Sequence, residues 1–275
     1  MIPQFTTKEE AFEYIRQNKD LIMKDKRSQI KHADGIGCVF VDYDESKNIA
    51  TKAAGSLAIL DTDKYKISAV INACGLLDTH GDVHIPGLWK KTVKETKSGL
   101  HLQEHVMRFD HVISKDVKVY TAIISWKDLG FNYPGTTEIL INEVIAEKKR
   151  NPFMAEQYAN GWVDQHSVGM YYVNYFLCLN SENKYDKEEK ANWDKYYPMV
   201  VNKDVADAYG FFFAVTEAKY VEGSAVVMGS NVATPTQSVE PIQPPEGTEK
   251  SIIEPVVKSL DYNAIAQAIQ NSFNH

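Results

Sequence analysis

The stretch that decides the fold runs from Asp164 to Val173 and reads Asp-Gln-His-Ser-Val-Gly-Met-Tyr-Tyr-Val. In an extended backbone both faces of this stretch carry large residues, which predicts a strand inside a sheet or barrel. Ser167 and Gly169 share one face, and the missing side chain at Gly169 leaves room for a substrate backbone near the serine hydroxyl. A Ser-x-Gly sequence alone is more often structural than catalytic, so a functional interpretation depends on partners elsewhere in the chain.

The composition bounds the class of protein. A chain of 275 residues, 44% of them hydrophobic, fits one large domain with appendages or two small domains. The formal net charge is -7 and no strongly basic stripe stands out, which predicts no nucleic-acid partner. The scattered cysteines Cys38, Cys74 and Cys178 favour a reducing compartment over a disulfide framework. No apolar run approaches the roughly 18 residues of a membrane span, and the first residues lack the order of a signal peptide.

Hydrophobic spacing predicts the elements of the N-terminal half. Thr7 and Glu10 have capping-box spacing at the start of an amphipathic helix expected over residues 7–24. A structured loop rich in glycine follows the second strand, and a helix is expected at 88–97. The strands expected here span residues 37–41, 65–73, 100–113 and 117–126, the last two paired with each other.

The C-terminal half is predicted to contain both helices and strands. A long helix is expected from Thr136 or Thr137, because Ile139, Leu140 and Val144 recur at helical spacing, and Pro152 is expected to break it. The charged segment 181–197 is interpreted as an exposed insertion. A short helix at 203–209 and strands at 211–220 and 222–229 complete the pattern.

Ser167 requires a base and an acid to act as a nucleophile near neutral pH. Histidine is the usual base, and a carboxylate then orients the imidazole and stabilises its cation. His111 in the expected strand 100–113 and Glu222 just before a strand supply these groups. The chain order of histidine, serine and acid differs from that of the chymotrypsin, subtilisin and α/β-hydrolase groups.

Each of these assignments has an alternative. His105 shares the expected strand face with His111 and is the other candidate base, and Glu217 is the other candidate acid. His166 adjoins Ser167 but should point to the opposite face. Asp78 and Asp82 are expected to hold a turn through side-chain-to-backbone hydrogen bonds.

Four short motifs, in this order and spacing, resemble one known family. They are Asp78-Thr79-His80-Gly81-Asp82 followed by Pro86-Gly87, Phe109-Asp110-His111, Ser167-Val168-Gly169-Met170, and Tyr220-Val221-Glu222-Gly223-Ser224-Ala225-Val226-Val227. The chain is similar in them to the prohead (capsid maturation) serine proteases of tailed phages, which are relatives of the herpesvirus assemblins. The resemblance covers roughly residues 67 to 234 and implies Ser167 as nucleophile, His111 as base and Glu222 as third member.

The resemblance implies an α+β fold, a herpesvirus-protease-like small β-barrel flanked by helices, and no cofactor or metal. The substrates implied are the major capsid protein and scaffolding segments, together with the chain's own C-terminal tail. The enzyme would act as an oligomer inside the assembling procapsid in the host cytoplasm, without a nucleic-acid or membrane partner.

The expected organisation has four parts, and the last two together form a flexible C-terminal tail. They are an N-terminal helical extension (1–34), the protease domain (35–232), a Pro-rich linker (233–258) and a C-terminal amphipathic helix (259–275).

Two other classes of function stay open. His101 and His105, or His80 and His84, are four apart, as in some zinc sites, although Gly81 argues against a helix between the second pair. The chain could alternatively be a catalytically inactive capsid or scaffold component with the same fold. Retained activity in a chelator would argue against zinc, and inert protein with an intact triad would favour the inactive component.

Overall fold

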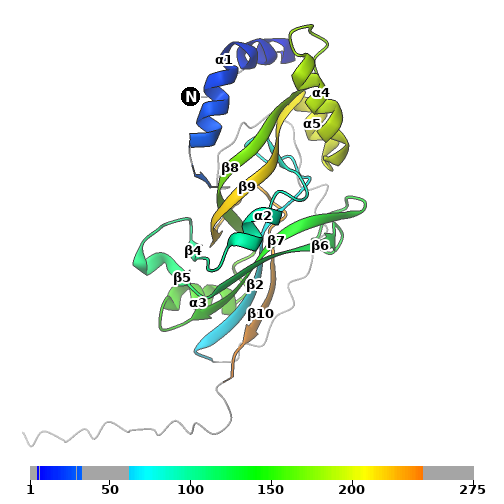
Figure 1. Cartoon of the computed structure of the whole chain (residues 1–275). Coiled ribbons are helices and arrows are strands. Elements are labelled where there is room, and N and C mark those ends of the chain that lie inside the picture. Colours follow the sequence, from blue (N-terminus) through cyan, green and yellow to red (C-terminus); the bar gives the residue numbers. More distant parts are fainter. Residues whose placement is uncertain (1–4, 6, 29, 33–61, 244–275) are drawn as a thin grey trace, which may run out of the picture. The chain divides into compact units, whose positions relative to one another are not determined.

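The computed structural model describes residues 5, 7–28, 30–32 and 62–243, and its fold is mixed α+β with two open sheets (Figure 1). The strand expected at 37–41 and the helix expected at 259–275 lie outside the described residues. No closed barrel is formed by the described strands, so the barrel expected from the resemblance is not observed there. No described helix is long and apolar enough to cross a membrane.

The larger sheet has six strands and carries the candidate site. Its order is β1-β8-β9-β4-β5, and β3 pairs separately with β9. These strands are β1 (Lys31–His32), β3 (Asp82–His84), β4 (His101–Gln103), β5 (Val112–Ser114), β8 (His166–Leu179) and β9 (Phe211–Ala225). The long antiparallel β8–β9 pair is its centre, and β1 pairs with the other edge of β8 at Gly169 and Met170.

The smaller sheet is antiparallel, in the order β10-β2-β7-β6. Its strands are β2 (Lys64–Ala73), β6 (Val117–Ser125), β7 (Thr136–Glu147) and β10 (Thr236–Pro241). The main hydrophobic core joins the two sheets, with Ile67 and Leu140 from the smaller sheet and Val168 and Phe213 from the larger one. The apolar faces of both sheets are thereby removed from water.

Helices and short 3-10 turns complete the described fold, and Figure 1 shows the helices around the strands of the two sheets. They are α1 (Lys8–Ser28), α2 (Lys90–Glu95), η2 (Phe109–His111), α3 (Pro152–Ala159), α4 (Lys187–Tyr196), η3 (Tyr197–Met199) and α5 (Lys203–Tyr209). In α1 the buried residues Ala11, Phe12 and Ile15 form the expected apolar stripe, and the N–H of Glu10 donates to Thr7 Oγ1 at 3.2 Å. The predicted helices at 7–24, 88–97 and 203–209 and the strands at 65–73 and 117–126 are confirmed, apart from small differences at their ends.

The predicted long helix from Thr136 is wrong, because this segment is strand β7. Ile139 and Ile141 pack in one buried cluster, whereas Leu140 and Val144 pack in another. A strand that is buried on both faces lacks the polar alternation that identifies a half-exposed strand. The apolar residues of this strand therefore matched the spacing expected of a helix.

The predicted strands at 211–220 and 222–229 are one strand, β9, which ends at Ala225. Across the ladder Gly169 pairs with Glu222 and Met170 with Tyr220, so Val221 is an extra residue in a β-bulge. The chain kinks there without ending the strand. The predicted strand 100–113 is also wrong, since it comprises β4, a turn, η2 and β5, and β6 pairs with β7 instead.

The charged segment 181–197 is not an exposed insertion. It contains α4, whose Trp193 and Tyr196 are buried, and the Tyr196 ring stacks on Phe176 of β8 with centroids 5.8 Å apart. Asp186 before this helix is also buried and pairs with Arg16 of α1. The segment is amphipathic, and its charges dominated the sequence pattern.

The predicted Pro-rich linker begins too early. Residues 236–241 form edge strand β10 on β2, and Ala233 and Thr234 are buried. Pro241 ends this strand, a position where a missing N–H is tolerated. The first unit of the chain accordingly extends to Ile242, and residues 244–258 lie outside the described residues.

Candidate active site

Ser167, His105 and Glu222 form one continuous hydrogen-bonded chain. His105 Nε2 lies 2.7 Å from Ser167 Oγ, and His105 Nδ1 lies 2.5 Å from Glu222 Oε1. All three residues are buried, with exposed fractions of 1% for Ser167, 8% for His105 and 0% for Glu222. One ring nitrogen faces the hydroxyl while the other is held by a carboxylate, which is the connectivity needed to activate a serine.

The β8–β9 ladder positions the serine and the acid. Ser167 pairs with Ser224, and Gly169 pairs with Glu222, so these four residues project to the same face of the sheet. A Cβ built on Gly169 would lie 2.1 Å from Glu222 Oε1. The carboxylate thus occupies the space of the missing side chain. The sequence predicted that the missing side chain at Gly169 leaves room for substrate. In the structure this space is occupied by the Glu222 carboxylate instead.

A left-handed turn brings the imidazole to the serine. β4 runs parallel to β9, and after it the N–H of Glu104 donates to the carbonyl of Ala225 at 2.9 Å. Glu104 and His105 then have φ values of 53° and 57°, a conformation that residues other than glycine rarely adopt. Such residues persist where the surrounding structure holds them, and they are found preferentially at functional sites.

His111, the predicted base, lies elsewhere. It ends η2, and its Nδ1 is 3.2 Å from Asp110 Oδ1. This neighbouring imidazole is the main cause of the lowered pKa of Asp110. His105 and His111 share no strand face because the turn at 104–105 interrupts the expected strand. The structure therefore places His105, the alternative candidate, beside Ser167, and the predicted base His111 does not contact it.

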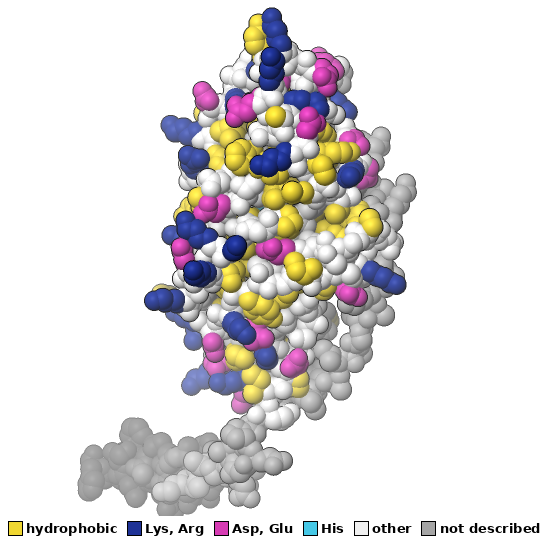
Figure 2. Space-filling model, turned by 45° about the vertical axis from the view of Figure 1, so that its right-hand side comes forward, with side chains coloured by type: hydrophobic (Ala, Val, Ile, Leu, Met, Phe, Trp, Pro, Cys, Tyr) yellow, Lys and Arg dark blue, Asp and Glu magenta, His cyan; other side chains and the backbone are white. Residues whose placement is uncertain are grey.

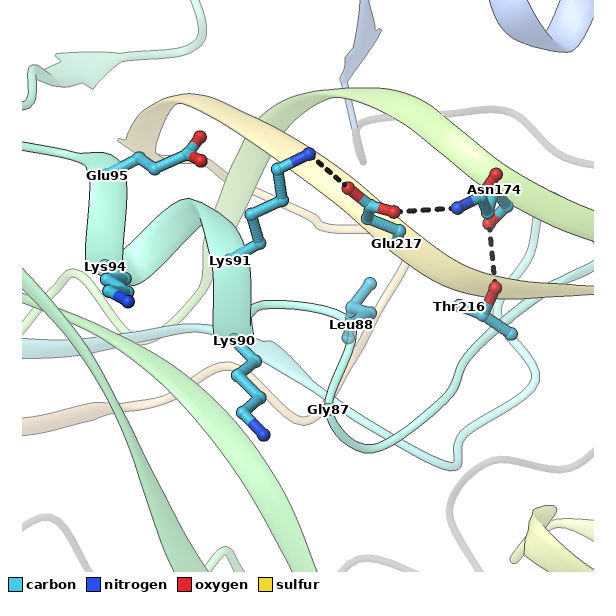
Figure 3. Close-up of a pocket in the computed structure, with 9 residues that line it drawn as sticks. All are labelled: Gly87, Leu88, Lys90, Lys91, Lys94, Glu95, Asn174, Thr216 and Glu217. Carbon is cyan, nitrogen blue, oxygen red and sulfur yellow. Dashed lines mark hydrogen bonds and ion pairs between the residues drawn. The ribbon is translucent and has the colours of Figure 1, made fainter.

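Glu217, the alternative acid, lines a separate surface pocket of about 570 Å³ (Figure 3). Its carboxylate accepts from Lys91 Nζ at 3.2 Å and from Asn174 Nδ2 at 2.7 Å. None of the three residues of the hydrogen-bonded chain lines this pocket. The lining residues are Gly87, Leu88, Lys90, Lys91, Lys94, Glu95, Asn174, Thr216 and Glu217.

His166 points to the face opposite Ser167, as expected, and joins a buried polar network. Its Nδ1–H donates to the carbonyl of Thr234 at 3.0 Å, so its Nε2 accepts from the Tyr158 hydroxyl at 3.0 Å. His101 Nε2–H donates to the Tyr158 oxygen at 2.8 Å, and Asn142 Nδ2 lies 3.3 Å from His101 Nδ1. Every bond has one donor and one acceptor only if both imidazoles are neutral.

Burial is the main cause of the low basicity of these imidazoles. It lowers the pKa of His166 to about 4 and that of His101 well below its usual value. His101 and His105 have separate partners, and no group of three or more His, Cys, Asp or Glu side chains in the described part of the chain is arranged to hold a metal ion.

Asp78 holds a turn, as predicted. Its Oδ1 accepts from the backbone N–H groups of His80 and Asp82, each at 2.9 Å. Burial, with a contribution from the charge of Asp82, raises the pKa of Asp78 to about 7. Asp82 has a different role, because its carboxylate pairs with Lys26 of α1 and accepts from the Tyr172 hydroxyl.

Ser224 was not predicted from the sequence as a site residue, although it contacts both His105 and Glu222. Its hydroxyl donates to Glu222 Oε2 at 2.6 Å, and it accepts from the N–H of His105 at 3.1 Å. The signal was available in the segment Glu222-Gly223-Ser224, because residues two apart in a strand share a face.

Models of protein families, curated proteins and solved structures provide no match to this chain.

Proposed function

We propose that the chain is a serine endopeptidase in which Ser167 is the nucleophile, His105 the general base and Glu222 the orienting acid. The observation that supports this most strongly is the continuous hydrogen bonding from Ser167 Oγ through both nitrogens of His105 to Glu222. Hydroxyl, imidazole and carboxylate in this order are the parts required for acyl transfer.

The proposed reaction has two halves. Ser167 Oγ attacks the peptide carbonyl carbon while His105 Nε2 takes the hydroxyl proton, and Glu222 stabilises the imidazolium that forms. The C–N bond then breaks, and His105 returns the proton to the leaving amine. A water molecule, deprotonated by His105, attacks the acyl-enzyme ester and releases the acid product with Ser167 regenerated.

We further propose that this peptidase matures phage proheads and has a herpesvirus-protease-like fold. The support is the resemblance of the motifs around Asp78, Ser167 and Glu222 to prohead proteases. Its substrates would be the major capsid protein and scaffolding segments inside the procapsid, in the host cytoplasm, and its own C-terminal tail. Assembly into the procapsid would make it oligomeric.

The surface charge agrees with the absence of a nucleic-acid partner from this proposal. On the face shown in Figure 2, acidic and basic side chains are interspersed among hydrophobic ones, and the basic side chains form no continuous surface there.

The experiment is co-expression of the full chain with the capsid protein encoded beside it, with products measured by intact mass. Wild type is compared with Ser167→Ala, His105→Gln and His111→Gln. We expect processing by wild type and His111→Gln, and none by the other two. Purified wild type should also react with a fluorophosphonate at Ser167. Processing that persists in Ser167→Ala, or an unreactive Ser167 together with unprocessed capsid protein, would contradict the proposal.

A further inference from the structure

Ser224 lies between the candidate base and acid. It is fully buried, sits opposite Ser167 in the β8–β9 ladder, and is two residues from Glu222 on the same face. Its hydroxyl donates to Glu222 Oε2 at an oxygen–oxygen distance of 2.6 Å, and its oxygen accepts from the N–H of His105 at 3.1 Å. We propose that Ser224 is a positioning residue that fixes the Glu222 carboxylate and the His105 backbone together. This inference rests on the proposed peptidase function.

The first half of the argument concerns the carboxylate. A carboxylate can rotate about its last bond and present either oxygen to a given donor. Here Ser224 engages Oε2, which leaves Oε1 for His105 Nδ1. Hydrogen bonds to a charged acceptor are short and strong, and the site is buried, where they gain further strength. Ser224 therefore selects the carboxylate orientation that holds the imidazole.

The second half concerns the backbone. His105 is the second of two residues with left-handed φ, and its N–H donates to Ser224 Oγ inside that turn. The preceding N–H, of Glu104, is held by the carbonyl of Ala225. Strand β9 thus fixes two successive amides of the turn, one through its backbone and one through Ser224. Loss of the hydroxyl would free the amide of the residue that carries the base.

The test is Ser224→Ala in the full chain, with the rate of fluorophosphonate labelling at Ser167 as readout. We expect labelling to slow by roughly 10- to 100-fold, because one charge-assisted hydrogen bond and the orientation it imposes are lost. The pH profile of labelling should also change, because the substitution removes a hydrogen-bond donor from the carboxylate that holds the imidazole. Ser224→Thr, which keeps the hydroxyl, should restore most of the rate. Ser224→Cys provides a second test of similar shape with a weaker donor.

Ser181→Ala is the matched control. Ser181 Oγ also donates to a buried carboxylate, that of Asp186, at 2.6 Å, but this pair lies between α1 and α4. The control should lose stability without moving the pH profile. In a Glu222→Gln background, Ser224→Ala should slow labelling by less than about 2-fold if Ser224 acts mainly through the acid.

A readout independent of activity separates this inference from the proposed function. The chemical shifts of the His105 ring nitrogens, measured by NMR at one fixed pH, should differ from those of wild type in Ser224→Ala and not in Ser181→Ala. If wild type is unreactive but these chemical shifts change, the positioning role stands and the peptidase proposal fails. If wild type reacts while Ser224→Ala leaves the rate, the pH profile and the chemical shifts unchanged, the positioning role is overturned.

Discussion

Gly169 and Glu222 face each other across the β8–β9 ladder, and the Glu222 carboxylate fills the space where a side chain at position 169 would lie. Gly169→Ala should therefore push the carboxylate away from His105. We expect fluorophosphonate labelling at Ser167 to fall by at least about 10-fold while the fold is retained. Thermal unfolding should be measured beside labelling, and unchanged labelling in a folded variant would contradict this account of the site.

His105 and His111 differ in what they contact, so their substitution by glutamine should differ in effect. His105→Gln removes the group beside Ser167 Oγ, and labelling should fall by roughly 10³-fold or more. His111→Gln leaves the hydrogen-bonded chain intact and should label at the rate of wild type. Equal losses in the two variants would show that both histidines support the nucleophile.

Stability should fall at acidic pH because the buried His166 and His84 are kept neutral. Burial lowers the pKa of each to about 4, whereas an unfolded histidine titrates near 6.5. Between these values the unfolded chain binds more protons, so stability rises with pH and is lost as pH falls from about 6.5 towards 4. Each histidine should contribute about 1.4 kcal/mol per pH unit there.

Asp78 titrates in the opposite sense, so this prediction is best measured as a difference between two proteins. The raised pKa of Asp78, about 7, makes its own contribution fall as pH rises through that value. His166→Asn keeps a donor near the carbonyl of Thr234 and removes only the imidazole. Urea unfolding at several pH values should give a shallower pH slope for this variant than for wild type, and the Asp78 contribution cancels. Parallel slopes would contradict the low pKa of His166.

The ion pair between Arg16 and Asp186 should anchor α1. Two hydrogen bonds of 2.9 Å join the guanidinium to a carboxylate whose side chain is 2% exposed. Arg16→Met leaves that carboxylate without its cation and should cost about 1–3 kcal/mol, with the partial exposure of Arg16 reducing the loss. Lys190→Met, which breaks an exposed pair with Asp194, should change stability by less than about 0.5 kcal/mol in the same unfolding assay.

The sequence predicted two of the three residues of the hydrogen-bonded chain and missed the third for a local reason. Ser167 lies in a strand where alternation determines the face of each side chain, whereas Glu222 was expected just before a strand and lies in β9 next to the bulge at Val221. His105 is itself the second of two left-handed residues, and neither of them is a glycine that would mark a turn. The strand assumed across residues 100–113 therefore placed both histidines on one face, and only the backbone geometry distinguishes them.

The error at β7 has a second physical cause, which is burial on both faces of the strand. β7 has apolar residues on both sides because it lies between two hydrophobic clusters, so its period could not be identified. In α4 the charged residues of the exposed side obscured Trp193 and Tyr196. Helix α1, in which Ala11, Phe12 and Ile15 recur at helical spacing and are buried, was predicted correctly.

The wide separation of the triad members along the chain affects when the protein can become active. His105 and Glu222 are 117 residues apart, so at a synthesis rate of about 5–20 residues per second the base exists for roughly 6 to 23 s before its acid is made. The edge strand β10 and the carbonyl of Thr234, which holds the start of β8, are made later still. A nascent chain that has not yet reached Glu222 therefore cannot form the hydrogen-bonded chain. In the proposed peptidase, this order of synthesis leaves Ser167 and His105 without their acid until Glu222 has been made.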